Sequence, residues 1–173
     1  MLSEMLEDWV YDKQVLALFA QVCPSCKPVP DALLAQAVAA RDYGKGTRYA
    51  RQQLYAAYDL ALYGPQPQDP MALWAQMEGA TPLGHVVGTK FPGGFGHTAT
   101  GYSAGYYGYL WSLVVATDLR TAFGAGHRLD PAVGSRYRSQ VLAQGSQQPP
   151  QQLVRQFLGR DFNAKAFFDE LAR

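Results

Sequence analysis

The sequence predicts an all-α chain, and two kinds of signal support this fold class. Apolar residues recur at the three- and four-residue spacing of amphipathic helices, and helix caps, glycines and prolines stand between these segments. The sequence contains no convincing strand pattern and no repeat period. Because 173 residues suit one domain with a sizeable core, we expect residues 1–173 to form a single helical segment.

Four helices are expected before a glycine-rich stretch. Ser3 is a plausible N-cap for the first, and Gly44 is the expected stop of the second. Thr47 is the expected cap of the third, and Asp69 followed by Pro70 starts the fourth. The expected helices cover residues 3–21, 31–43, 48–63 and 70–77.

The second half is expected to begin with a long helix from Ser103 or Ala104 to Phe123. This segment is apolar nearly all round until Asp118, so we expect it to be buried. Asp130, which precedes a proline, and Asn163 are further cap signals, and a polar linker covers residues 144–149. The remaining helices are expected at residues 131–142, 150–158 and 164–172.

Composition and charge exclude several classes of partner. The net charge is +1, which predicts no broad attraction to nucleic acid or to an anionic membrane. No apolar run approaches the roughly 20 residues of a membrane span, and Met1 opens no signal peptide, so a cytoplasmic location is expected. Charged residues make up 17 % of the chain, against roughly 25 % in typical soluble domains. Much of the surface is therefore expected to pack against something.

The two cysteines form one C-x-x-C motif, Cys23-Pro-Ser-Cys26. A zinc site needs three or four protein ligands, and the motif has no second pair or histidine nearby. A thioredoxin-like motif would sit in a βαβ context, which the sequence does not indicate. We therefore expect incidental thiols at a helix end, with a local redox pair as the alternative.

The glycine-rich stretch from Gly84 to Trp111 carries the strongest functional signal. Its glycines allow the backbone to approach a ligand closely, and its tyrosines add apolar faces and hydroxyls. Tyr102, Tyr106 and Tyr109 are spaced four and then three apart, so they share one face of about 10 Å if Tyr102 is already helical. Such a stripe is also typical of half-buried packing. The functional interpretation is a substrate-binding loop over residues 84–103, followed by a row of phenols.

The segment FGHTATGYSAGYYGYLWS at residues 95–112 resembles the "FGH…GGY…YYGYLWS" signature of the thimet oligopeptidase, neurolysin and oligopeptidase A family, the M3 zinc metallopeptidases. Residues 3–9, 133–138 and 157–160 resemble its "PSQMLENW", "VG-x-x-YR" and "FLGR" segments, in the same order and spacing. The resemblance therefore extends over nearly the whole chain. One departure is Thr100-Gly101 in place of paired glycines, and the β-branched threonine predicts a stiffer loop.

The resemblance implies the C-terminal helical part of an M3 catalytic domain of the zincin type. The family binds zinc through an H-E-x-x-H motif, which this chain lacks, and through a glutamate that maps immediately ahead of Met1. None of the three histidines has a histidine partner three or four residues away. We therefore expect no metal ligand within this chain, and no zinc binding or peptide cleavage by the chain alone. Activity would need the H-E-x-x-H segment from another polypeptide.

The resemblance also implies roles for individual residues. In the family, the tyrosine that matches Tyr109 donates a hydrogen bond to the oxyanion. The family residues that match His97 and Tyr102 contact the substrate or the transition state. Glu7 matches a glutamate that supports the metal site from behind its ligands, although its pattern also fits a solvated carboxylate. Substrate contacts fall on Gly96, Gly101 and Tyr106.

Three other charged residues receive no firm role from the sequence. Glu4 stands where the family has glutamine, so it is not expected to be a ligand. Arg136 and Arg138 fit either structural ion pairs or contacts to a substrate carboxyl terminus.

Two functions follow from these observations. The first is the C-terminal part of a zinc-dependent oligopeptidase that hydrolyses short peptides. The alternative is a non-catalytic helical peptide-binding module, or a remnant of a disrupted peptidase gene. A remnant that exposes a former interior would self-associate, and the low charge content favours that form of the alternative.

Overall fold

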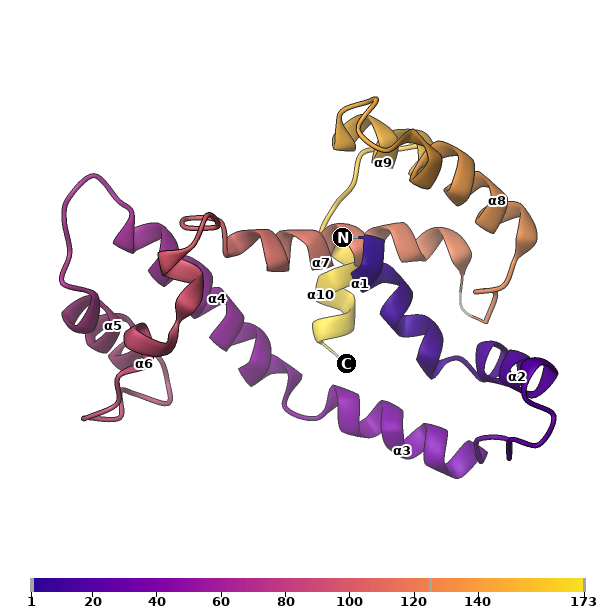
Figure 1. Cartoon of the computed structure of the whole chain (residues 1–173), viewed down its shortest axis with the longest axis horizontal. Coiled ribbons are helices and arrows are strands. Elements are labelled where there is room, and N and C mark those ends of the chain that lie inside the picture. The colour runs from indigo at the N-terminus through magenta and orange to yellow at the C-terminus, as the bar shows by residue number, and fades with distance from the viewer. Residues whose placement is uncertain (1, 125, 173) are drawn as a thin grey trace. The chain divides into compact units, whose positions relative to one another are not determined.

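The computed structural model describes residues 2–124 and 126–172, and for residues 2 and 3 the backbone only. Every regular element in these ranges is a helix, which confirms the all-α prediction (Figure 1). The chain divides into two compact units: residues 44–111, and the residues up to Tyr43 together with those from Ser112 onward. Among the helices in the described ranges, none has both the length and the apolar character needed to cross a bilayer.

The unit of residues 44–111 is built on the helix α4 (Lys45–Leu62). Its other elements are α5 (Pro70–Gly79), α6 (Phe91–Gly94), the short 3₁₀ helix η2 (Gly96–Ala99) and the first residues of α7 (Tyr107–Arg120). Leu54, Tyr58 and Trp74 form its buried core, against which Tyr55, Phe91 and Phe95 pack.

Two cap predictions in this unit have different outcomes. Asp69 caps α5 as predicted, because its Oδ1 accepts the N–H of Ala72 at 2.7 Å. The prediction of Thr47 as the cap of α4 is wrong. The helix begins at Lys45, directly after Gly44, whose φ of 64° suits glycine. Gly44 thus starts α4, and α3 has already ended at Asp42.

The second unit contains ten helical segments within the described residues: α1 (Leu2–Glu7), η1 (Asp8–Tyr11), α2 (Lys13–Val22), α3 (Asp31–Asp42), the C-terminal part of α7, η3 (Thr121–Phe123), α8 (Pro131–Gln140), η4 (Leu142–Gln144), α9 (Pro150–Leu158) and α10 (Lys165–Leu171). Its core gathers side chains from several of these segments. They are Met5, Val115, Ala116, Leu119, Phe123, Tyr137, Val141, Val154 and Phe157.

The single helix predicted over residues 3–21 is interrupted in the structure at Asp12. The backbone of Asp12 is extended, and its Oδ1 accepts the N–H groups of Gln14 and Val15 at 2.8 and 3.4 Å. Asp12 is therefore an N-cap that starts α2. Ser3 lies inside α1 rather than ahead of it, so its predicted cap role is wrong.

The helix α7 is shorter and more exposed than the sequence predicts. It begins at Tyr107 rather than Ser103 or Ala104, because the preceding residues form turns and Ala104 has a φ of 57°. Only residues 115–119 are buried along it, whereas Tyr107, Tyr109 and Trp111 are each about half exposed. The prediction that the whole helix is buried is wrong.

Asp118 lies in the buried part of α7, with its side chain 1 % exposed. Its two oxygens accept hydrogen bonds from both terminal nitrogens of Arg160 at 2.8 and 2.6 Å, and from the N–H of Asn163 at 2.9 Å. Burial raises the pKa of this carboxyl group, but the hydrogen bonds from Arg160 and Asn163 outweigh burial and hold the pKa below its ordinary value.

The lowered pKa of Asp118 predicts a loss of stability in acid. The unfolded carboxyl titrates near pH 4, so the ionised pair contributes fully above that pH and is lost as the pH falls through the lower, folded pKa. Acid unfolding followed by circular dichroism should therefore have a shallower pH dependence in Asp118→Asn. Asp169→Asn, which alters an exposed pair with Lys165, is the control. Equal acid slopes for Asp118→Asn and the unaltered chain would contradict this prediction.

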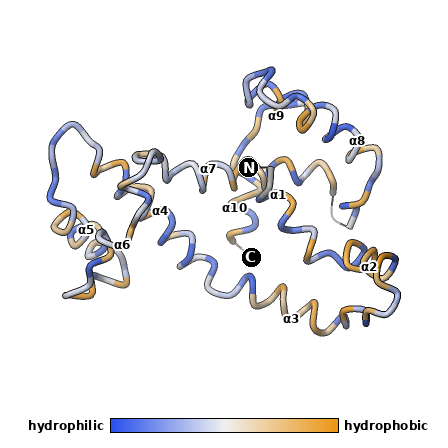
Figure 2. Tube along the Cα trace, viewed as in Figure 1, coloured by the Kyte–Doolittle hydropathy of each residue, from blue (hydrophilic) through white to orange (hydrophobic). Residues whose placement is uncertain are grey.

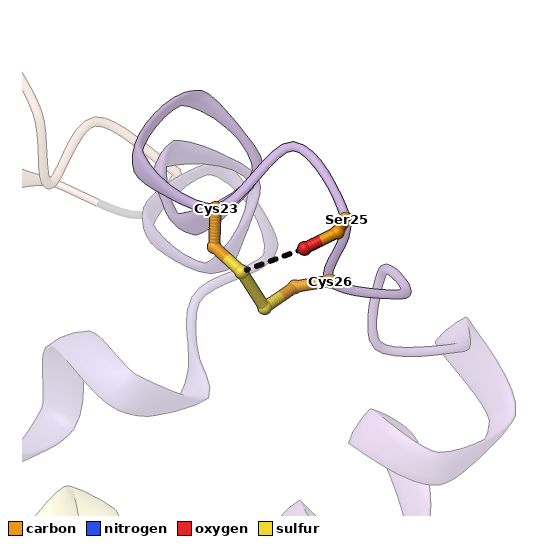
Figure 3. The surroundings of a disulfide bond; sticks show 3 residues. All are labelled: Cys23, Ser25 and Cys26. Carbon is orange, nitrogen blue, oxygen red and sulfur yellow. Dashed lines mark hydrogen bonds between the residues drawn. A yellow bond between two sulfur atoms is a disulfide. The ribbon is translucent and has the colours of Figure 1, made fainter.

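Cys23 and Cys26 form a disulfide directly after α2 (Figure 3). The expectation of incidental free thiols is therefore wrong, because the two sulfur atoms are bonded to each other. The turn that follows α2 explains the pairing, because the Cys26 N–H donates to the Cys23 carbonyl at 2.9 Å. The two Cα atoms then lie 5.3 Å apart, within the span that a disulfide bridges.

Large apolar side chains remain on the surface of α2. The helix is drawn mostly in the hydrophobic colour in Figure 2, yet Phe19 is exposed and Val22 is 81 % exposed. This exposure agrees with the expectation, from the low charge content, that parts of the surface pack against something.

Candidate functional site

The glycine-rich loop is anchored on a group of aromatic rings in the unit of residues 44–111. Phe91, at the start of α6, lies 4.1 Å from the ring of Trp74 on α5 and 4.8 Å from that of Tyr55 on α4, centroid to centroid. Phe95 lies 4.9 Å from Phe91. Each such pair adds about 0.5–1.5 kcal/mol beyond the area it buries. The loop is therefore tied to both helices just before His97.

His97 is the centre of the candidate site. Four aromatic rings lie around its imidazole at centroid distances of 4.9 to 6.0 Å, and they belong to Phe95, Tyr102, Tyr106 and Tyr109. Its Nε2 is buried, and within the described part of the chain it has no hydrogen-bond partner. The structure thus brings together the three residues for which the resemblance implies catalytic roles, together with Tyr106.

The tyrosines do not meet through the shared helical face considered from their spacing. Tyr102 lies in a turn before α7, so the condition that it be helical is not fulfilled. It stacks on His97 at 5.9 Å, whereas Tyr106 and Tyr109 contact each other at 5.1 Å. The histidine, rather than a helix, links the three phenols.

The phenols differ in how available they are to a ligand. Tyr102 is 73 % exposed and Tyr109 is 55 % exposed, whereas Tyr106 is half-buried. The hydroxyl of Tyr106 donates to Oε1 of Gln52 at 2.8 Å. Burial raises the pKa of Tyr106, against a smaller lowering by the hydrogen bond to Gln52, so this phenol keeps its proton. A ligand would therefore meet Tyr102 and Tyr109 first.

The glycines of the loop leave space around its backbone. A Cβ atom added at Gly96 or Gly101 would meet nothing within 4 Å. Thr100 donates its hydroxyl to the His97 carbonyl at 3.0 Å and accepts the Tyr102 N–H at 3.4 Å. This hydroxyl therefore joins the two loop residues that stack on each other.

A polar cluster around a buried glutamate, near the start of the loop, is absent from the sequence predictions. Glu78 on α5 is buried and binds Nη1 of Arg51 at 2.5 Å and Nδ1 of His85 at 2.6 Å. Burial raises the pKa of Glu78, but the hydrogen bonds from His85 and Arg51 outweigh it and lower the pKa overall. His85 is thus committed to tying the loop to α5. No local motif marks a histidine seven residues after its partner.

Asp59 is a second residue that sequence reasoning missed. It lies on α4, is 0 % exposed, and its Oδ2 accepts the backbone N–H of Tyr106 at 3.0 Å. The signal that could have revealed it is a lone carboxylate beside the apolar residues of the helix predicted at 48–63.

The other predicted residues lie in the second unit. Glu7 ends α1 and is exposed, next to Asp8, which pairs with Arg41 and Arg120. The guanidinium of Arg136 lies over the ring of Phe157, with its carbon 5.2 Å from the ring centroid, whereas Arg138 is exposed. In residues 2–124 and 126–172, no three His, Cys, Asp or Glu side chains come together in a way that could hold a metal ion.

Comparison with known proteins identifies the family. The family model described as "Peptidase family M3" matches residues 1–173. The chain is 30 % identical to saccharolysin of Saccharomyces cerevisiae over 98 % of its own length and 25 % of the relative's. It is 28 % identical to oligopeptidase A of Escherichia coli over 92 % of its length and 24 % of the relative's. A thimet-like oligopeptidase of Dictyostelium discoideum is 30 % identical over 95 % of the chain and 25 % of the relative. The chain thus spans about a quarter of the length of these relatives, and it belongs to peptidase family M3.

Proposed function

We propose that this chain supplies substrate-binding and oxyanion-stabilising residues to a zinc-dependent oligopeptidase that hydrolyses short peptides. The observation that carries the proposal is the group of rings around His97, in which Tyr102 and Tyr109 are exposed. Membership of peptidase family M3 and the names of the relatives support peptides as the substrate class.

In this proposal, each residue of the group has a separate task. Tyr109 donates a hydrogen bond from its phenolic hydroxyl to the oxygen that becomes negatively charged when the peptide carbonyl is attacked. Tyr102 and His97 contact the bound peptide. Tyr106, which packs against α4, lines the same site. Gly96 and Gly101 allow the peptide backbone to approach the loop, because no side chain stands there.

The described residues do not fit a zinc site by themselves, since no three possible ligands come together among them. We therefore propose that the zinc ligands and the general base come from a polypeptide segment that carries H-E-x-x-H, with Glu7 supporting that site from behind its ligands. The chain alone would then bind peptides without cleaving them.

Peptide binding by the purified chain tests the proposal. A short fluorescent peptide, followed by anisotropy, should bind saturably. Tyr102→Ala should weaken binding about 5- to 10-fold, the equivalent of ~1–1.4 kcal/mol of lost ring contact. Tyr107→Ala is the matched control, because Tyr107 is also an exposed tyrosine and lies at the start of α7, five residues after Tyr102. No saturable binding, or equal binding by both variants, would refute the proposed site.

Cleavage of a quenched peptide separates the two candidate functions. Addition of a polypeptide that carries H-E-x-x-H, with zinc, should produce chelator-sensitive cleavage. Saturable binding without cleavage in that mixture would favour the non-catalytic peptide-binding module. Stoichiometric zinc and chelator-sensitive cleavage with the chain alone would contradict the proposed dependence on a second segment.

A further inference from the structure

One face of α4 holds the residues around the candidate site. Gln52, Tyr55 and Asp59 follow one another at intervals of three and four residues, so they lie along a single side of the helix, and Tyr63 directly follows its last residue, four positions after Asp59. Three of them contact Tyr106: Gln52 accepts its hydroxyl, Tyr55 meets its ring edge-on at 5.8 Å, and Asp59 accepts its N–H. Tyr63 donates its hydroxyl to the carbonyl of Thr98. This face therefore holds both η2 and the start of α7.

Asp59 is the acidic member of this face, and its surroundings are unusual for a carboxyl group. It is fully buried, and Oδ1 has no hydrogen-bond partner among the residues that the structure describes. Its Oδ2 accepts the Tyr106 N–H at 3.0 Å, across 47 residues of sequence. A buried carboxyl group is costly unless it is hydrogen-bonded. The hydrogen bond from the Tyr106 N–H therefore offsets part of the cost of burying Asp59.

The bond from Asp59 is made at the N-terminal end of α7. The first N–H groups of a helix have no partner inside the helix, and that end carries a partial positive charge. The first turn of α7 contains no acidic residue of its own. The Tyr106 N–H lies immediately before this turn, so the carboxyl group of Asp59 on α4 supplies the acceptor that a capping side chain would otherwise supply.

We propose that Asp59 is a positioning residue of the candidate site. By holding the Tyr106 N–H, it fixes where α7 starts, and with that start the rings of Tyr106 and Tyr109. Tyr106 meets His97 edge-on at 4.9 Å, and Tyr109 lies 5.1 Å from Tyr106. A shift of the helix start therefore moves the proposed oxyanion donor and loosens the contact with His97. The catalytic consequence rests on the proposed function, whereas the geometric consequence does not.

Histidine NMR signals of the labelled chain test this positioning directly, because the ring protons of His97 sense the four neighbouring aromatic rings. The probe is specific, since the chain has three histidines and His97→Gln identifies one set of signals. Asp59→Asn keeps the shape and one acceptor oxygen but removes the charge, and Asp59→Ala removes both. We expect the His97 signals to shift modestly in Asp59→Asn and to move to less ring-shifted positions in Asp59→Ala.

His85 is an internal control, because it is held by Glu78 rather than by the rings around His97. A specific positioning role predicts that the His85 signals stay in place while those of His97 move. Asp69→Asn is the matched variant, since Asp69 caps α5 in the same unit and its change should leave both sets unmoved. Unmoved His97 signals in Asp59→Ala, or equal displacement of His85 and His97 in Asp59→Asn, would overturn the proposal.

The peptide-binding assay, run on the same variants, separates this proposal from the proposed function. Asp59→Asn should weaken peptide binding about fivefold while Asp69→Asn leaves it unchanged. Moved His97 signals together with no peptide binding by the unaltered chain would refute the proposed function and leave the positioning role standing. Peptide binding that is intact in Asp59→Ala, with unmoved His97 signals, would refute the positioning role and leave the proposed function standing.

Discussion

Replacing Tyr109 with phenylalanine is expected to lower kcat about 10²–10³-fold in a peptidase reconstituted from this chain and a polypeptide that carries H-E-x-x-H. The substitution keeps the ring, which lies 5.1 Å from Tyr106 and 6.0 Å from His97, and removes only the hydroxyl. Loss of one oxyanion donor corresponds to about 3–4 kcal/mol of transition-state stabilisation. Because the oxyanion exists only near the transition state, KM should change little.

Tyr107→Phe makes the same chemical change at a neighbouring exposed tyrosine that is outside the group of rings around His97. It should leave both kcat and KM close to those of the unaltered chain. Initial rates with a quenched peptide over a range of concentrations separate the two constants. A change confined to KM in Tyr109→Phe would indicate a role in ground-state binding, and an unchanged kcat would exclude Tyr109 as the oxyanion donor.

The features that the sequence predicted correctly are those encoded within one helical turn. Asp69 and Asp130 each precede a proline. Asp69 accepts one backbone N–H of the turn that follows, and Asp130 accepts two. The helix predicted at 150–158 has those bounds in the structure. Such signals need no knowledge of the rest of the chain, because the cap, the proline and the first turn are neighbours in sequence.

The features that were missed depend on contacts across longer stretches of sequence. Asp59 meets Tyr106 across 47 residues, and Arg160 meets Asp118 across 42. From its sequence, α7 looked buried up to Asp118, yet no residue in its first half is buried. Asp118 itself is buried, because Arg160 and Asn163 satisfy its carboxyl group. The spacing of apolar residues predicts which face of a helix can be buried, but it does not predict which distant residue packs against that face.

The candidate site shows the same division. The resemblance selected His97, Tyr102 and Tyr109, and the structure places them together. Spacing alone suggested a helical stripe, whereas Tyr102 reaches the group from a turn by stacking on His97. The residues that hold the group in place, on α4 and α5, carry no motif that a single sequence reveals.

Replacing Trp74 with alanine is expected to lower the free energy of unfolding of the unit of residues 44–111 by about 3–5 kcal/mol. Trp74 is 0 % exposed, stacks on Phe91 at 4.1 Å and meets Tyr58 edge-on at 5.2 Å. Truncation removes the buried area and leaves a cavity beneath Phe91, where the loop is anchored. Urea unfolding followed by circular dichroism measures the loss.

The same helix offers the control, because Met71 lies on α5 with its side chain partly exposed. Met71→Ala should change the free energy of unfolding by no more than about 0.5 kcal/mol. Trp74→Phe keeps an aromatic ring against Phe91 and should recover part of the stability lost in Trp74→Ala. A loss below about 1 kcal/mol in Trp74→Ala would mean that the ring group does not anchor the loop. In that case Trp74→Ala should also bind peptide as the unaltered chain does, because a loop held independently of Trp74 keeps His97 and the neighbouring tyrosines in place.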